Sequence, residues 1–113
     1  MIDLAELFER INSAHFDGFL EAPRLRWNGR LCSSAGRFIP GRKRFLTEFP
    51  PTIEVASYLV EENQAEALVA DTLAHEMIHL RQHLTGDREL HGPRFRRMAT
   101  RVCIAHGFDP KIF

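Results

Sequence analysis

The chain has 113 residues, 44% of them hydrophobic and 27% charged, and its 15 basic and 15 acidic residues cancel to a formal net charge of zero. This length accommodates one hydrophobic core but not two, so we expect residues 1–113 to form a single domain. The sequence has neither the basic-then-apolar order of a signal peptide nor an apolar run of about 18 residues, so it predicts a cytoplasmic protein and no membrane association.

The first predicted element is an amphipathic helix that begins near Ile2 and ends near the Asp17-Gly18 turn signal. Apolar residues recur at helical spacing along one face of it, with charged residues opposite. The apolar residues of this face are Leu4, Leu7, Phe8 and Ile11.

A strand is predicted over residues 24–28, where apolar and polar residues alternate in RLRWN as in a half-buried strand. Asn28-Gly29 is a strong signal for a tight hairpin. We therefore expect a second strand within residues 31–38 that runs antiparallel to the first. The basic segment PGRKRF, residues 40–45, is predicted to be a turn or loop.

TIEVASYL, residues 52–59, is predicted to be a third strand. As an edge strand it would hold an extended peptide substrate by backbone pairing. The side chains on one face of this strand are Ile53, Val55 and Ser57.

A long helix is predicted from about residue 63 to residue 84, with Gly86 placed to cap its end. Pro93 suits the first turn of a last helix. Together the elements predict an α+β fold that comprises an N-terminal helix, a small three-stranded antiparallel sheet, the long helix and a C-terminal helix.

The long helix contains HEMIH, a match to the HExxH pattern of zinc sites. His75 and His79 are four residues apart, so their imidazoles lie on one helix face about one turn apart and can share a zinc ion. Glu76 points to the flank of that face, where it can accept a proton from water without binding the metal. The alternative for so short a motif is a surface helix with scattered histidine and glutamate residues.

A catalytic zinc ion usually has three protein ligands and one open position. His83 continues the four-residue spacing, but its backbone lies about 12 Å from that of His75, so one ion cannot easily collect all three histidines of the helix. His91 lies beyond the Gly86 break, at the start of the last helix, which can fold back towards the metal. We therefore predict His91 as the third ligand, with Glu89 as a weaker substitute.

HEMIH followed by DRELHGPRF resembles the SprT-like zincins, the family that includes the Spartan branch of DNA-dependent metalloproteases. FDGFLEAPRLRWNGRLCSSAGRF is similar to the entry segment of that family, and TIEVASYLV to the strand before its active-site helix, so the resemblance covers most of the chain. It implies a minimal zincin-like domain in which His75, His79 and His91 hold zinc (Zn²⁺) and Glu76 is the catalytic glutamate. Phe95 corresponds to the aromatic residue that packs the last helix.

These features predict a monomeric zinc-dependent endopeptidase that acts on a protein or peptide substrate. Glu76 would carry the proton of a water molecule to the leaving amine. Tyr58, His83 and Arg88 are candidates for stabilising the oxyanion, although such residues are more often structural or exposed to solvent. Two alternatives stay open: a zinc-containing DNA- or protein-binding module with little turnover, and a peptidase with no DNA role.

Basic residues concentrate in two segments: residues 24–44 have seven cations and no acid, and residues 81–113 have seven cations and three acids. These cations can pair with the acidic segments or remain solvated, or they can form a surface for DNA phosphates, which arginine binds well. Such a surface would bind single-stranded or otherwise exposed DNA, associate the protein with the nucleoid and direct cleavage to DNA-bound or DNA-crosslinked proteins. The candidate residues are Arg24, Arg26, Arg30, Arg37, Arg42, Lys43, Arg44, Arg94 and Arg97.

Overall fold

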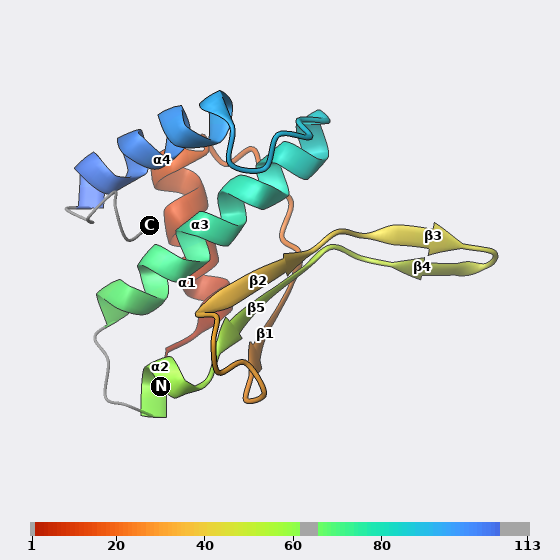
Figure 1. Cartoon of the computed structure of the whole chain (residues 1–113), viewed down its shortest axis with the longest axis horizontal. Helices are drawn as coiled ribbons and strands as arrows, with labels where there is room; N and C mark the ends of the chain where they lie inside the picture. Colours follow the sequence, from red (N-terminus) through yellow and green to blue (C-terminus); the bar gives the residue numbers. More distant parts are fainter. Residues whose placement is uncertain (1, 62–65, 107–113) are drawn as a thin grey trace.

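The computed structural model describes residues 2–61 and 66–106, apart from the side chains of residues 44, 61 and 106. Within these residues the chain forms four α-helices, a three-stranded sheet and a separate two-stranded hairpin (Figure 1), which confirms the α+β class. The elements are α1 (Leu4–His15), β1 (Arg24–Asn28), β2 (Gly36–Ile39), β3 (Arg42–Arg44), β4 (Thr47–Phe49), β5 (Thr52–Ala56), α2 (Tyr58–Glu61), α3 (Glu66–Thr85) and α4 (Pro93–His106).

Helix α1 forms where it was predicted, with its apolar residues buried. The side chain of Asp3 caps it by accepting hydrogen bonds from the backbone N–H groups of Ala5 and Glu6 at 3.0 and 3.3 Å. At the other end of the helix, the buried side chain of Asn12 bonds both backbone groups of Leu20, which holds the returning chain against the helix.

The three-stranded sheet has the order β1-β5-β2 and is mixed: β5 pairs with β1 in parallel and with β2 in antiparallel orientation. The predicted hairpin between residues 24–28 and 31–38 and the fully antiparallel sheet are therefore wrong. The side chain of Asn28 makes other bonds: it donates to Glu54 at 3.1 Å and accepts the backbone N–H of Arg30 at 2.8 Å. Because β5 lies between β1 and β2, these two strands are not neighbours.

Strand β5 is central because it is buried throughout and includes a carboxylate that needs partners on both sides. Glu54 is fully buried, and Arg26 of β1 and Arg37 of β2 form ion pairs with it from the neighbouring strands. Burial by itself raises the pKa of Glu54, but hydrogen bonds from Arg37, Asn28 and Arg26 outweigh this effect and lower its pKa. A buried carboxylate is stable only with such compensation, so the two arginine-bearing strands flank β5.

The basic segment 40–45, predicted as a turn or loop, contributes strand β3, which pairs antiparallel with β4. Figure 1 shows this hairpin projecting away from the rest of the molecule. Its tip residues, Phe45 and Leu46, are almost fully exposed to solvent. The predicted strand 52–59 is also shorter than expected, since β5 ends at Ala56 and the chain turns into the short helix α2.

Helices α1 and α3 pack against the three-stranded sheet, and α4 packs against α3 (Figure 1). The first residues of the predicted helix 63–84 lie outside the described residues, and α3 accounts for the remainder. None of the described helices has the length and hydropathy needed to span a membrane. The core between these layers is mainly apolar. Its largest buried side chains include Phe8, Ile53, Leu73, Met77 and Ile78.

Candidate metal centre

Helix α3 carries His75, Glu76 and His79 near its middle. Its sequence favours a helix because it is rich in alanine and leucine and has neither glycine nor proline. Glu76 and His79 are 7% and 9% exposed, so they lie at the boundary between the core and the surface. The ring centroids of His75 and His79 are 5.0 Å apart, as expected for a pair on one helix face.

The chain reverses direction directly after α3. Gly86 has a φ of 77°, in the left-handed region that favours glycine. The backbone N–H of Asp87 donates to the carbonyl of Gln82 at 2.9 Å, the six-to-one bond of a Schellman cap. The prediction that Gly86 caps this helix is confirmed, and the reversal turns the chain back along α3 towards α4, which begins at Pro93.

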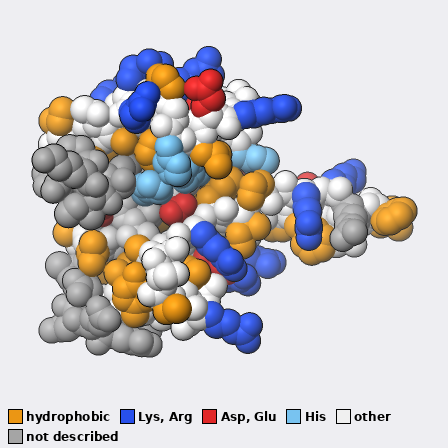
Figure 2. Space-filling model, in the orientation of Figure 1, with side chains coloured by type: hydrophobic (Ala, Val, Ile, Leu, Met, Phe, Trp, Pro, Cys, Tyr) orange, Lys and Arg blue, Asp and Glu red, His pale blue; other side chains and the backbone are white. Residues whose placement is uncertain are grey.

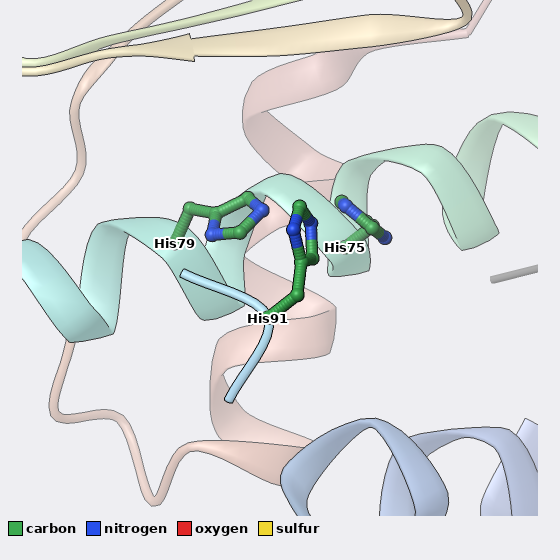
Figure 3. A group of neighbouring side chains, drawn as sticks. All are labelled: His75, His79 and His91. Atoms are coloured by element: carbon green, nitrogen blue, oxygen red, sulfur yellow. The ribbon is translucent and has the colours of Figure 1, made fainter. Parts of the chain in front are cut away.

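His91 approaches the histidine pair from the segment before α4, so the three side chains converge from two parts of the chain (Figure 3). Its ring centroid lies 5.7 Å from that of His75 and 4.9 Å from that of His79. One ligand nitrogen from each histidine lies within 4.8 Å of the other two. Three imidazole nitrogens this close together are a group that could hold one metal ion. Among the described residues, neither His83 nor Glu89 belongs to this group.

Phe95, from the first turn of α4, supports the three imidazole rings. Its ring centroid lies 5.0 Å from that of His75 and 4.9 Å from those of His79 and His91, and the side chain is buried. An aromatic ring in contact with all three histidines restricts their rotation. The contact also joins α4 to α3 at the site.

Burial sets the protonation states at the site. Desolvation, together with the nearby His79 and His91, lowers the pKa of His75 to about 4. Desolvation likewise lowers the pKa of His79, as does His91, while a hydrogen bond to Gln82 opposes the shift. His75 is therefore neutral at pH 7, and neutral imidazole is the form that binds metal. Desolvation raises the pKa of Glu76 to about 7, close to the optimum for a group that both accepts and donates a proton at neutral pH.

The three histidines and Glu76 line a cavity of about 780 Å³. Figure 2 shows the histidine side chains exposed in a hollow, with an acidic side chain beside them. Three imidazole nitrogens with an open side suit a catalytic zinc ion, which keeps a fourth position for water or substrate. The residues present therefore fit zinc.

The three residues predicted as candidates for stabilising the oxyanion differ in whether they line this cavity. His83 and Arg88 line it, whereas Tyr58 belongs to α2 and is not among its described lining residues. The His83 ring faces Phe38 of β2, with the centroids 5.7 Å apart. His83 is thus at the wall of the cavity and apart from the three-histidine group.

The strand predicted to hold an extended peptide is not an edge strand. β5 is hydrogen-bonded to β1 on one side and to β2 on the other, so its backbone has no free edge. Ile53 and Val55 have no exposed surface, and Ser57 lies beyond the end of the strand. The prediction is therefore wrong for all three residues. Among the described strands, β2 has a neighbour on one side only, and it lines the cavity, so it is the sheet edge beside the histidines.

The close approach of β2 to α3 depends on Gly36. A Cβ atom at this position would lie 2.7 Å from Cγ2 of Thr72 and 2.9 Å from the carbonyl oxygen of Glu54. Both distances are shorter than a normal contact, so only glycine fits without displacement of the helix or the strand. Cγ of Glu76 would be 3.5 Å away, so this contact also bears on the position of the catalytic candidate.

Five of the arginines proposed to contact DNA line two surfaces. Arg24, Arg26 and Arg42 line a cavity of about 520 Å³ near the base of the hairpin. Arg94 and Arg97 line another, of about 560 Å³, together with Arg81 and Arg101. The remaining candidates are Arg30 and Lys43, which are exposed, Arg37, which pairs with Glu54, and Arg44, whose side chain lies outside the described part of the chain.

Gln82 was not singled out from the sequence, although the structure connects it to the site. It is 3% exposed, and its side-chain oxygen lies 2.8 Å from Nδ1 of His79. The available signal was its position three residues after His79, a spacing that places two side chains on the same helix face. A buried glutamine is uncommon, but burial is a property of the tertiary structure.

Comparisons with known proteins identify the family of this chain. The model of the SprT-like family matches residues 4–112. The chain is 34% identical over 114 aligned positions to the human protein named DNA-dependent metalloprotease SPRTN, and 35% identical over 115 positions to the mouse and bovine proteins of that name. Each alignment covers 98% of this chain and 22% of the relative, so the chain spans about a fifth of the length of these relatives. By its family match, the chain belongs to the SprT-like family.

Proposed function

We propose that this chain is the catalytic domain of a zinc-dependent endopeptidase. The observation that carries the proposal is the convergence of His75, His79 and His91 in the cavity that also contains Glu76. Membership of the SprT-like family supports it, since relatives at 34–35% identity are named metalloproteases. The three histidines would hold the metal and leave Glu76 free for proton transfer.

Zinc bound by these histidines supplies a Lewis acid for the scissile carbonyl and lowers the pKa of a water molecule. Glu76 lies next to His75 on the cavity wall, where its carboxylate takes a proton from the attacking water. The same carboxyl group then delivers the proton to the leaving amine. Burial raises the pKa of Glu76 in the metal-free protein, which makes its carboxylate a stronger proton acceptor than an exposed one.

The free edge of β2 is the proposed binding surface for the substrate backbone. It borders the histidines through Gly36, Arg37 and Phe38, and an extended peptide can add to such an edge as a further strand. A peptide substrate with N-methylated backbone amides flanking the scissile bond should then show a raised KM. An unchanged KM would argue against strand addition at β2.

The metal ligands are tested by zinc content after dialysis of the wild type, His91→Ala and His83→Ala proteins. We expect one zinc ion in the wild type and in His83→Ala, because His83 lies outside the three-histidine group. His91→Ala should lose most of its zinc. A full equivalent of zinc in His91→Ala would refute the third ligand.

Glu76→Gln separates an endopeptidase from a zinc-containing binding module. The substitution keeps the size of the side chain and removes the proton acceptor, so zinc should remain while casein cleavage falls by about 10²-fold or more. A wild-type protein that binds zinc and cleaves neither casein nor histones would favour the binding module.

The finer proposal is that the peptidase acts near DNA, on DNA-bound or DNA-crosslinked proteins. The two arginine-lined surfaces support it, as does the hairpin, where exposed Arg42 and Lys43 stand beside an apolar tip that could stack on unpaired bases. The relatives are named DNA-dependent metalloproteases. Histone digestion with and without single-stranded DNA tests this role, and equal rates would indicate a peptidase that DNA does not regulate.

A further inference from the structure

The side chain of Gln82 makes hydrogen bonds to both segments that carry the three histidines. Its Oε1 lies 2.8 Å from Nδ1 of His79, within α3. Its Nε2 group donates to Oδ2 of Asp87 at 3.1 Å and to the carbonyl oxygen of Glu89 at 3.0 Å, both in the segment that leads to His91. One buried amide thus joins the metal-binding face of the helix to the loop that supplies the third histidine.

The hydrogen-bond partners determine the orientation of this amide. Asp87 and Glu89 offer only oxygen acceptors, so the NH₂ group of Gln82 must face them. The amide oxygen then faces His79, and because an amide oxygen can only accept, Nδ1 of His79 must carry the proton. In a neutral imidazole this leaves Nε2 with the lone pair that a metal requires.

We propose that Gln82 is a positioning residue for the metal site, with two separable actions. Its oxygen holds His79 in the tautomer that presents Nε2 to the metal, and its NH₂ group holds the 87–89 segment so that His91 stays near the histidine pair. This role rests on the proposed metal site and adds to it a residue that does not touch the metal.

Two variants test these actions. Gln82→Met keeps a side chain of similar length but makes none of the three hydrogen bonds, so both actions are lost. The double variant Gln82→Glu with Asp87→Asn exchanges the amide and the carboxylate. The carboxylate introduced at position 82 would still accept from Nδ1–H of His79, and the new amide at position 87 could donate to it. The bond to the carbonyl oxygen of Glu89 is lost, because a carboxylate has no donor. Leu84→Ala is the control, since Leu84 lies in the same turn of α3 but is exposed to solvent.

Zinc affinity, measured by competition with a chelator, is the first readout. Loss of a group that orients a metal-binding histidine typically weakens metal binding about 10- to 100-fold, which is the change expected for Gln82→Met. The double variant should bind zinc more tightly than Gln82→Met, because it keeps the bonds to His79 and to position 87. Leu84→Ala should bind zinc as the wild type does.

The second readout is the Nδ1–H proton of His79 in the zinc-loaded protein, observed by NMR. It should exchange slowly with solvent in the wild type and the double variant, and rapidly in Gln82→Met. If Gln82→Met acted only through a general packing defect, zinc binding would weaken, but the double variant would not restore the slowly exchanging Nδ1–H proton of His79. Wild-type affinity together with a protected proton in Gln82→Met would overturn the inference while the metal site stands. Failure of the wild type to bind zinc would overturn both.

Discussion

At the scale of single residues, the site places a carboxyl group and neighbouring imidazoles where water is scarce. Glu76 is 7% exposed, and desolvation raises its pKa to about 7, while desolvation and two nearby rings lower the pKa of His75 to about 4. Both shifts favour the uncharged forms in the metal-free protein. The Glu76 shift lowers the stability of the folded protein as the pH rises, and the His75 shift lowers it as the pH falls. Replacement of Glu76 therefore removes the first effect and leaves the second.

Glu76→Gln should stabilise the metal-free protein increasingly as the pH rises. The folded-state pKa of Glu76, about 7, exceeds its ordinary value of 4.5, so the folded wild type binds more protons between these values and loses stability as the pH rises through them. Glutamine does not titrate. Between about pH 5 and about pH 8, the advantage of the variant should therefore grow by about 2 kcal/mol.

Urea unfolding with a chelator present, at both pH values, measures this difference. The His75 contribution runs the other way, since its lowered pKa costs stability as the pH falls from 6.5 towards 4, and it is common to the wild type and the variant. A pH-independent difference between the two proteins would show that Glu76 is not desolvated as described.

At the scale of elements, the site depends on how closely β2 lies against α3. Gly36 allows this approach, and the ion pairs of Arg26 and Arg37 with Glu54 hold β2 and β1 on either side of β5. The Schellman turn at Gly86 supplies the other constraint, because it returns the chain so that His91 meets the helix. Two contacts between elements thus form the cavity wall and complete the histidine group.

Gly36→Ala should destabilise the protein by about 1–3 kcal/mol, the usual cost of inserting a methyl group where there is no room. It should also slow cleavage, because Glu76 is one of the nearest neighbours of the new methyl group. Gly29→Ala is the matched control: its nearest neighbour would be Oγ of Ser57 at an ordinary 3.9 Å. Denaturant unfolding and casein cleavage check both effects, and equal stability of the two variants would contradict the tight contact.

At the scale of the whole molecule, a net charge of zero conceals two arginine-lined surfaces. One lies near the base of the hairpin, and the other is lined by Arg81 of α3 and by residues of α4. Part of the positive charge is structural, since Arg26 and Arg37 neutralise Glu54, yet their guanidinium-bearing side chains remain about half exposed. Pairing with acids and contact with DNA are therefore compatible roles for the same residues.

Double substitution of Arg94 and Arg97 by alanine should weaken binding of single-stranded DNA and reduce the slope of log affinity against log salt by about 1. Arg24 and Arg42, replaced together, test the other surface in the same way. Arg10→Ala is the control, because Arg10 pairs with Glu6 and Glu66 at 3.4 and 3.6 Å. Fluorescence anisotropy at several salt concentrations measures the slopes. A wild-type protein whose affinity does not depend on salt would exclude the DNA role and leave the peptidase proposal intact.

The sequence by itself determined the features that depend on local periodicity. The 3.6-residue turn places His75 and His79 on one face, and the alternation in RLRWN distinguishes apolar from charged positions before any partner strand is known. The cap at Gly86 and the start of α4 at Pro93 likewise follow from the conformational preferences of these two residues.

Only the tertiary structure decided which segments are neighbours. The order β1-β5-β2 depends on the burial of Glu54 between two arginines, and a local turn signal such as Asn28-Gly29 cannot anticipate it. The distance from His91 to the histidine pair and the bonds of Gln82 also depend on packing between α3, its following loop and α4. Side-chain periodicity and turn preference depend on residues that are close together in the chain. Burial and strand order result instead from contacts between residues that are far apart in it.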